Sequence, residues 1–139
     1  MGTRADFYVG RGKDAEWLGS IAFDGYPSGI DGEILLAATK AEYLVAVNKF
    51  FGNGRDDVTL PANGWPWPWN NSRTTDYAYA FDDGKVYANC FGYEWFLATE
   101  DQPDREYDKN ENKKCEFPDM SGKKNVTYEK RSGLIVVSA

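Results

Sequence analysis

The chain has 139 residues, enough for one domain that buries about two-thirds of the surface of its unfolded form. Its 42% hydrophobic and 16% aromatic content is that of a folded globule, which excludes disorder as the default. A net charge of −6 disfavours nucleic acids and anionic membranes as general partners and favours basic proteins or cations.

Neither a membrane segment nor a secretory leader is expected. No run approaches ~18 apolar residues, and the N-terminus MGTRADFYVG has no apolar signal core, so we expect a cytoplasmic protein. Two cysteines, Cys90 and Cys115, are too few for a disulfide scaffold or a zinc site. Both thiols are therefore expected to be reduced.

The first expected element is a β-hairpin. Residues 7–9 are β-prone and stop at the glycine-rich turn of residues 10–13. Residues 16–24 then alternate with strand periodicity. The alternation predicts one shared face for Trp17, Gly19, Ile21 and Phe23.

A single helix is predicted for residues 33–51. Its expected apolar stripe contains Ile34, Leu35, Ala38, Ala41, Leu44, Val45 and Val47. Ser28 or Asp31 can cap the start, because a short side-chain oxygen can accept from the free amides of the first turn. Lys49 in the last turn and Gly52 just beyond it indicate the end.

The clearest local pattern is YAYAFDDGKVYANCF, which predicts a second hairpin. Taking Asp83-Gly84 as a two-residue turn pairs the strands so that Asp82 faces Lys85. In this register one face holds Tyr77, Tyr79, Phe81, Val86 and Cys90, and the other holds Ala78, Ala80, Tyr87 and Asn89. Cys90 is therefore expected to be a packing residue.

The rest of the chain completes an α+β fold. Residues 93–98 can add a strand, and residues 134–137 suit a strand covered on both sides. Residues 100–116 are dense in both charge signs and are expected to form an exposed loop or a ragged hairpin. We therefore predict a single domain over residues 1–139, with a mainly antiparallel sheet of about five strands and one long helix packed on one face.

Apparent motifs for cofactors and metals are weak. Residues 10–15 match a dinucleotide fingerprint formally, but a strand follows where a helix is required. The alternating acids of residues 104–110 lack the glycine and glutamate of a calcium loop. A hairpin turn and a solvated loop explain them better, so we expect neither cofactor nor metal.

The residues also argue against an enzyme. The chain has no histidine, which removes the ordinary catalytic triad and His-based metal sites. The pairs Asp56-Asp57 and Asp82-Asp83 are adjacent along the chain, whereas an acid and a base must face each other. A carboxylate-based hydrolase is kept as the third hypothesis for the function.

A proline-stiffened arm carries the candidate binding residues. In GWPWPWNN, Trp65, Trp67 and Trp69 alternate with prolines, which favours a rigid, polyproline-like segment. We expect one or two rings to plug the core and at least one to point outward beside Arg55 and Arg73, as in a binding hot spot. The acidic segment with Asp101, Asp104 and Glu106 is the other candidate for the partner contact.

The stretch TRADFYVGRGKDAEWLGSIAFDGYPSGI, residues 3–30, resembles the opening of a family of small uncharacterised proteins of bacteriophages and prophages. The resemblance implies a phage accessory protein, and such proteins often look like anti-defence factors, including anti-CRISPR proteins. We therefore expect a non-enzymatic inhibitor that occludes a basic surface of a bacterial host protein. The alternative is sequestration of a nucleotide signal between the tryptophans and Arg55 or Arg73.

Overall fold

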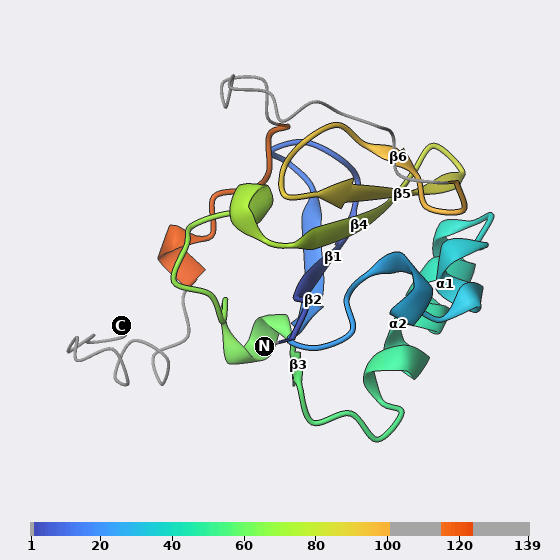
Figure 1. Cartoon of the computed structure of the whole chain (residues 1–139), viewed down its shortest axis with the longest axis horizontal. Coiled ribbons are helices and arrows are strands. Elements are labelled where there is room, and N and C mark those ends of the chain that lie inside the picture. The colour runs from blue at the N-terminus through green and yellow to red at the C-terminus, as the bar shows by residue number, and fades with distance from the viewer. Residues whose placement is uncertain (1, 101–114, 124–139) are drawn as a thin grey trace.

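A six-stranded mixed sheet forms the centre of the structure, with the strand order β3-β2-β1-β4-β5-β6 (Figure 1). The computed structural model describes residues 2–100 and 115–123. Strands β1 and β4 pair in parallel, and the other neighbours pair antiparallel. The strands are β1 (Ala5–Val9), β2 (Glu16–Ile21), β3 (Val58–Thr59), β4 (Tyr77–Asp82), β5 (Lys85–Cys90) and β6 (Phe96–Leu97). The α+β prediction is confirmed.

The β4–β5 hairpin has the register expected from the sequence. Tyr77 pairs with Cys90 and Asp82 with Lys85, so the predicted faces are confirmed. Asp83 and Gly84 lie at φ +52° and +75°, as both central residues of a type I′ turn require. The strand expected within residues 93–98 is present as the short β6.

The β1–β2 hairpin is also present, but it contains a bulge. Phe7 pairs with Gly19 and Tyr8 with Trp17, so Leu18 is an extra residue on β2. The extra residue turns Trp17 to the face opposite Ile21, and the prediction of one shared face was wrong for this reason. Gly19 is needed beside the bulge, because a Cβ there would lie 2.6 Å from the Phe51 ring.

The long helix predicted for residues 33–51 is broken in two. Helix α1 (Gly32–Leu35) begins after Asp31, and helix α2 (Lys40–Phe51) begins after Thr39, whose hydroxyl accepts from the Glu42 amide. The break changes the phase of the apolar pattern. The buried face of α2 is Tyr43, Ala46, Val47, Phe50 and Phe51, whereas the expected members Ala38, Ala41 and Val45 are exposed.

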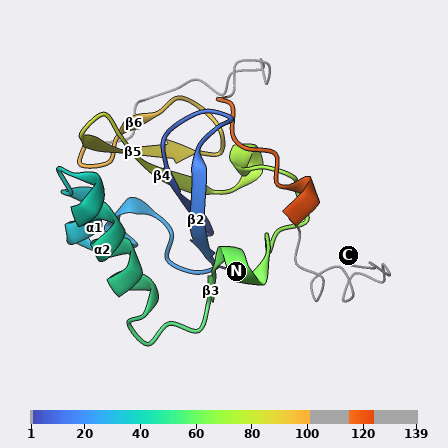
Figure 2. The ribbon, with the colours of Figure 1, turned by 180° about the vertical axis from the view of Figure 1, so that it is seen from behind.

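The sheet is covered differently on its two faces (Figures 1 and 2). Alternate residues of β1 and β4, such as Phe7 and Tyr79, pack under the two helices. The intervening residues, such as Tyr8 and Ala80, pack under the tryptophan arm and residues 115–120. The arm is thus the second layer over the sheet.

Some expectations fall outside this description. The strand expected at residues 134–137 and the acidic residues Asp101, Asp104 and Glu106 lie outside the described residues. Within residues 2–100 and 115–123, no helix has both the length and the apolar character needed to cross a bilayer.

Candidate functional site

The tryptophan arm lies across the sheet and is largely buried. Trp65 is fully buried and Trp67 is 8% exposed, while Trp69 is half-buried. Trp65 packs edge-on against Trp17, with ring centroids 5.1 Å apart. Two of the three expected partner-binding rings therefore belong to the core of this chain.

Each indole N–H of the arm has an acceptor within the protein. Trp65 donates to the carbonyl of Trp69 at 2.6 Å, and Trp69 donates to the Thr75 hydroxyl at 2.9 Å. Trp67 donates to the Asp6 carboxylate at 2.7 Å. Of these three bonds, the one from Trp67 joins the arm to the sheet, while the other two hold the arm and the residues before β4 in place.

Asp6 is the centre of a buried polar cluster beneath the arm. Its Oδ1 accepts from the Ser20 hydroxyl at 2.5 Å and its Oδ2 from the Ser72 hydroxyl at 2.6 Å, in addition to the Trp67 indole. The Ser72 oxygen also lies 2.5 Å from the Tyr8 hydroxyl. These donors suit an ionised carboxylate, which can only accept.

Burial controls the acidity of this cluster. Loss of hydration raises the pKa of Asp6 above its usual range, although the hydrogen bonds from Ser20, Ser72 and Trp67 oppose this change. Burial, followed by the nearby Asp6 charge, raises the pKa of Tyr8 as well. The sequence analysis missed Asp6 because its partners are distant in the chain.

Local backbone geometry places the arm. Gly64, at φ +86°, turns the chain after a short 3-10 helix (Pro61–Asn63), and Asn71 caps another (Ser72–Thr74) by accepting from the Arg73 amide. Two backbone bonds link the arm to the described C-terminal segment: Trp65 N–H to Lys123 and Met120 N–H to Asn70. Both ends of the arm are therefore hydrogen-bonded to residues 120–123.

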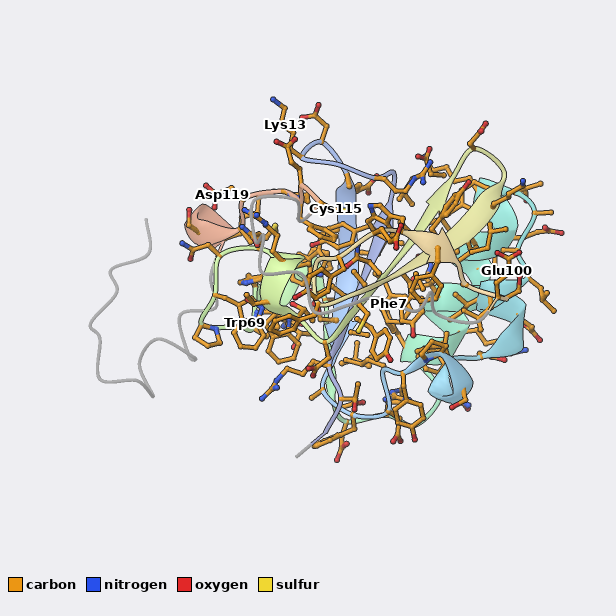
Figure 3. All side chains as sticks on the ribbon, turned by 45° about the horizontal axis from the view of Figure 1, so that its top comes forward. Phe7, Lys13, Trp69, Glu100, Cys115 and Asp119 are labelled. Atoms are coloured by element: carbon orange, nitrogen blue, oxygen red, sulfur yellow. The ribbon has the colours of Figure 1, made fainter. Side chains whose placement is uncertain are left out.

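The outermost ring of the arm is Trp69, which lies on the side of the molecule away from the helices (Figure 3). It stacks on Trp67 with centroids 5.7 Å apart, and the Arg4 guanidinium lies 5.5 Å from each ring. Arg73 is half-buried near the start of β4. Arg4 is a residue that the sequence analysis did not single out.

The structure does not bring Arg55 to the arm. Its guanidinium lies 4.7 Å from the ring of Phe50, in the cluster on the helix side of the sheet, and donates to Asp57 at 2.8 Å. Burial acts against ionisation of Asp57, but Arg55 and the amides of Phe23 and Ala22 lower its pKa overall. The expectation that an outward ring lies beside Arg55 was wrong.

The adjacent aspartates have separate roles. Asp57 accepts from Arg55 and from the backbone of residues 22 and 23, while Asp82 binds Arg11 at 2.9 Å and Asp83 forms the hairpin turn. The residue 10–13 turn is held to the sheet by Gly10 N–H, which donates to Phe81. Among the described residues, no group of three His, Cys, Asp or Glu side chains could hold a metal ion.

An open groove lies between α1 and α2, on the other side of the molecule. It has a volume of about 490 Å³ and is lined by Glu33, Leu36, Ala37, Ala41, Glu42, Val45 and Ala46. Leu36 is 73% exposed and Val45 is 68% exposed, so two large aliphatic side chains open to solvent line the same groove. The helix break produces this groove, because it turns Val45 outward.

The sequence contains a local signal for the helix break beside this groove, but the continuous apolar pattern of residues 33–51 obscured it. Thr39-Lys40-Ala41-Glu42 has the spacing of a capping box, which marks the start of a new helix. In the structure the Glu42 carboxylate accepts from the Ala38 amide at 2.9 Å. The other acidic residue of the lining, Glu33, pairs with Lys49 at 3.3 Å.

No family model, no curated protein and no solved structure matches this chain. The bacteriophage resemblance of residues 3–30 therefore remains an expectation from the sequence.

Proposed function

We propose that this protein is a non-enzymatic, phage-encoded binding protein that inhibits a bacterial defence system by occluding a host protein. The observation that carries the binding role is the groove between α1 and α2, with the exposed side chains of Leu36 and Val45 at its rims. Exposed apolar patches bordered by polar residues are typical of protein-interaction sites. The bacteriophage and anti-defence parts rest on the resemblance of residues 3–30 and on the acidic net charge of −6.

The groove replaces the tryptophan arm as the first candidate for the partner contact. A contact surface must be accessible, and Trp65 and Trp67 are buried. By contrast, Leu36 and Val45 contribute apolar area that is largely open to solvent and would be removed from water on binding. Burial of such area is the main driving force for protein association.

The test is phage growth on bacterial strains that each carry one defence system. Expression of the wild-type protein is expected to raise the plaque count on at least one strain, and Val45→Asp is expected to abolish this rise. Trp69→Ala is the matched control, because Trp69 lies on the other side of the molecule (Figure 3). Unchanged plaque counts on every strain would refute the anti-defence role.

A second candidate is sequestration of a nucleotide signal. One observation favours it: Trp69 is half-buried and has the Arg4 guanidinium beside its ring, a combination that suits base stacking. Affinity capture of the protein from a bacterial lysate, followed by mass analysis of released proteins and small molecules, separates the two candidates. A nucleotide released from wild type but not from Trp69→Ala would favour sequestration.

A further inference from the structure

We propose that the groove between α1 and α2 binds an amphipathic helix of the partner, with aliphatic side chains on the groove floor and Lys or Arg side chains beside Glu33 and Glu42. This inference rests on the proposed function and adds the chemical class of the partner segment.

The floor of the groove fits aliphatic side chains. Ala37 and Ala46 are 6% and 3% exposed and form its base, while Ala41 is exposed and lines the groove with the more prominent side chains of Leu36 and Val45. Small residues between larger ones leave a depression that a side chain from another helix can enter, as in ridges-into-grooves packing. An apolar side chain seated there would cover all three alanines.

The backbone around the groove favours a helix over a strand as the occupant. A partner strand needs unpaired backbone N–H and C=O groups at a sheet edge. The groove is instead lined by residues of α1, α2 and their connection, where the amides of Leu36, Ala37 and Ala38 already donate to Gly32, Ile34 and Glu42. Binding must then come from side chains, as when an amphipathic helix lies in an apolar groove.

The charges of the lining select a basic partner. Glu33 and Glu42 are exposed, and none of the other five lining residues carries a charge. The Oε1 atom of Glu33 binds Lys49, and the Oε1 atom of Glu42 accepts from Ala38. Because a carboxylate can accept at both oxygens, each can also bind a Lys or Arg of a partner.

The same charges argue against a second copy of this chain. Two such grooves packed face to face would bring their Glu33 and Glu42 side chains together, and like charges across an interface are unfavourable. The net charge of −6 adds to this repulsion. We therefore expect the groove to remain free of self-association.

The test uses a displayed library of short random peptides selected against the intact wild-type protein. The selection keeps peptides that bind wild type but bind neither Val45→Asp nor Leu36→Asp. These peptides should have aliphatic residues at helical spacing and an excess of Lys and Arg. A synthetic copy of the most enriched peptide should bind wild type about thirtyfold more tightly than either variant, as expected for loss of a central apolar contact. Both substituted side chains are largely exposed, so each variant is expected to fold, and its melting temperature is to be measured as the check.

The double variant Glu33→Gln/Glu42→Gln tests whether the two carboxylates bind basic side chains of the peptide. Glutamine keeps an acceptor oxygen for Lys49 and Ala38 but removes the charge. This variant should bind the peptide about tenfold more weakly, the effect expected for two exposed ion pairs. The matched control is Asp14→Asn/Glu16→Gln, which removes two exposed charges from the β1–β2 region and should leave the affinity unchanged.

Three results would overturn the inference, and the first two are enriched peptides that bind wild type and Val45→Asp equally and enriched peptides with net negative charge. A dimer in sedimentation equilibrium that Val45→Asp dissociates would also overturn it and assign the groove to a second copy. The peptide test needs no host factor. If basic peptides bind at the groove but plaque counts stay unchanged on every strain, the anti-defence role is rejected and the groove remains a binding site for a basic helix.

Discussion

The Trp67 indole N–H and the Asp6 carboxylate lie 61 positions apart in the sequence and form a buried hydrogen bond of 2.7 Å. This bond joins the tryptophan arm to a central strand of the sheet. Asp6 is fully buried and belongs to strand β1. Because the middle ring of the arm donates to this carboxylate, the arm packs against the sheet and does not extend into solvent.

The first prediction concerns the stability that Asp6 provides. Asp6→Ala removes the acceptor of Trp67, Ser20 and Ser72 and leaves buried donors without a partner, so we expect a loss of about 3 kcal/mol or more in the free energy of unfolding. Asp6→Asn keeps one acceptor oxygen and the shape, and should lose less than half as much. Urea unfolding measures both, and equal losses would show that the hydrogen bonds are unimportant.

The second prediction is a pH dependence. Because burial raises the pKa of Asp6, the folded state binds a proton more tightly than the unfolded state. The contribution of Asp6 to stability is therefore complete below its unfolded pKa near 4 and is lost as pH rises through the folded pKa, by at most ~1.4 kcal/mol per pH unit.

This effect is isolated by comparing wild type with Asp6→Asn at several pH values between 4 and 7 and at constant ionic strength. Asp57, whose pKa is shifted downward, is present in both proteins and cancels in the difference. The stability of wild type relative to Asp6→Asn should fall as pH rises. A relative stability that increases with pH would show that the hydrogen bonds, and not burial, control Asp6.

The third prediction concerns the β4–β5 turn. Gly84 lies at φ +75°, a conformation that a β-branched residue rarely adopts, so Gly84→Val should lower the free energy of unfolding by about 1 kcal/mol or more. Gly32→Ala is the control, because a Cβ at Gly32 meets open space at the start of α1. Thermal unfolding compares the two, and similar melting temperatures would contradict the turn assignment.

The fourth prediction separates the roles of the arm. Trp65→Ala should cost about 3–5 kcal/mol because its ring is fully buried, and Trp69→Ala should cost less because its ring is half-buried. Trp69→Ala should also retain partner binding, since the proposed contact is at the groove. If a stable Trp69→Ala protein loses inhibition, the outward ring and Arg73 form part of the interface after all.

The accuracy of the sequence predictions depended on how local their causes were. The β4–β5 register was predictable because alternation over residues 77–90 and the Asp83-Gly84 turn constrain the same short segment. The helix break was not predicted because the apolar residues at positions 33–51 mimic one continuous helix and outnumber the single local sign of a new start, the capping box at Thr39. The bulge at Leu18 has no comparably strong local signal.

The candidate site was predictable only in part for the same reason. The burial of one or two rings followed from the geometry of the arm, but the position of their acceptor did not, because Asp6 is one aspartate among many in the sequence. Arg55 was placed beside the arm on the basis of sequence proximity, whereas the fold pairs it with Asp57 on the helix side.

The parallel pairing of β1 with β4 has a consequence for how the protein is made. The Arg4 amide bonds the Asp76 carboxylate, 72 positions further along, just before the two strands meet. At ~5–20 residues per second, the ribosome adds β4 roughly 4–14 s after β1. During that interval Phe7 and Tyr8 lack their final neighbours from β4, so the nascent chain exposes aromatic surface that a chaperone could bind.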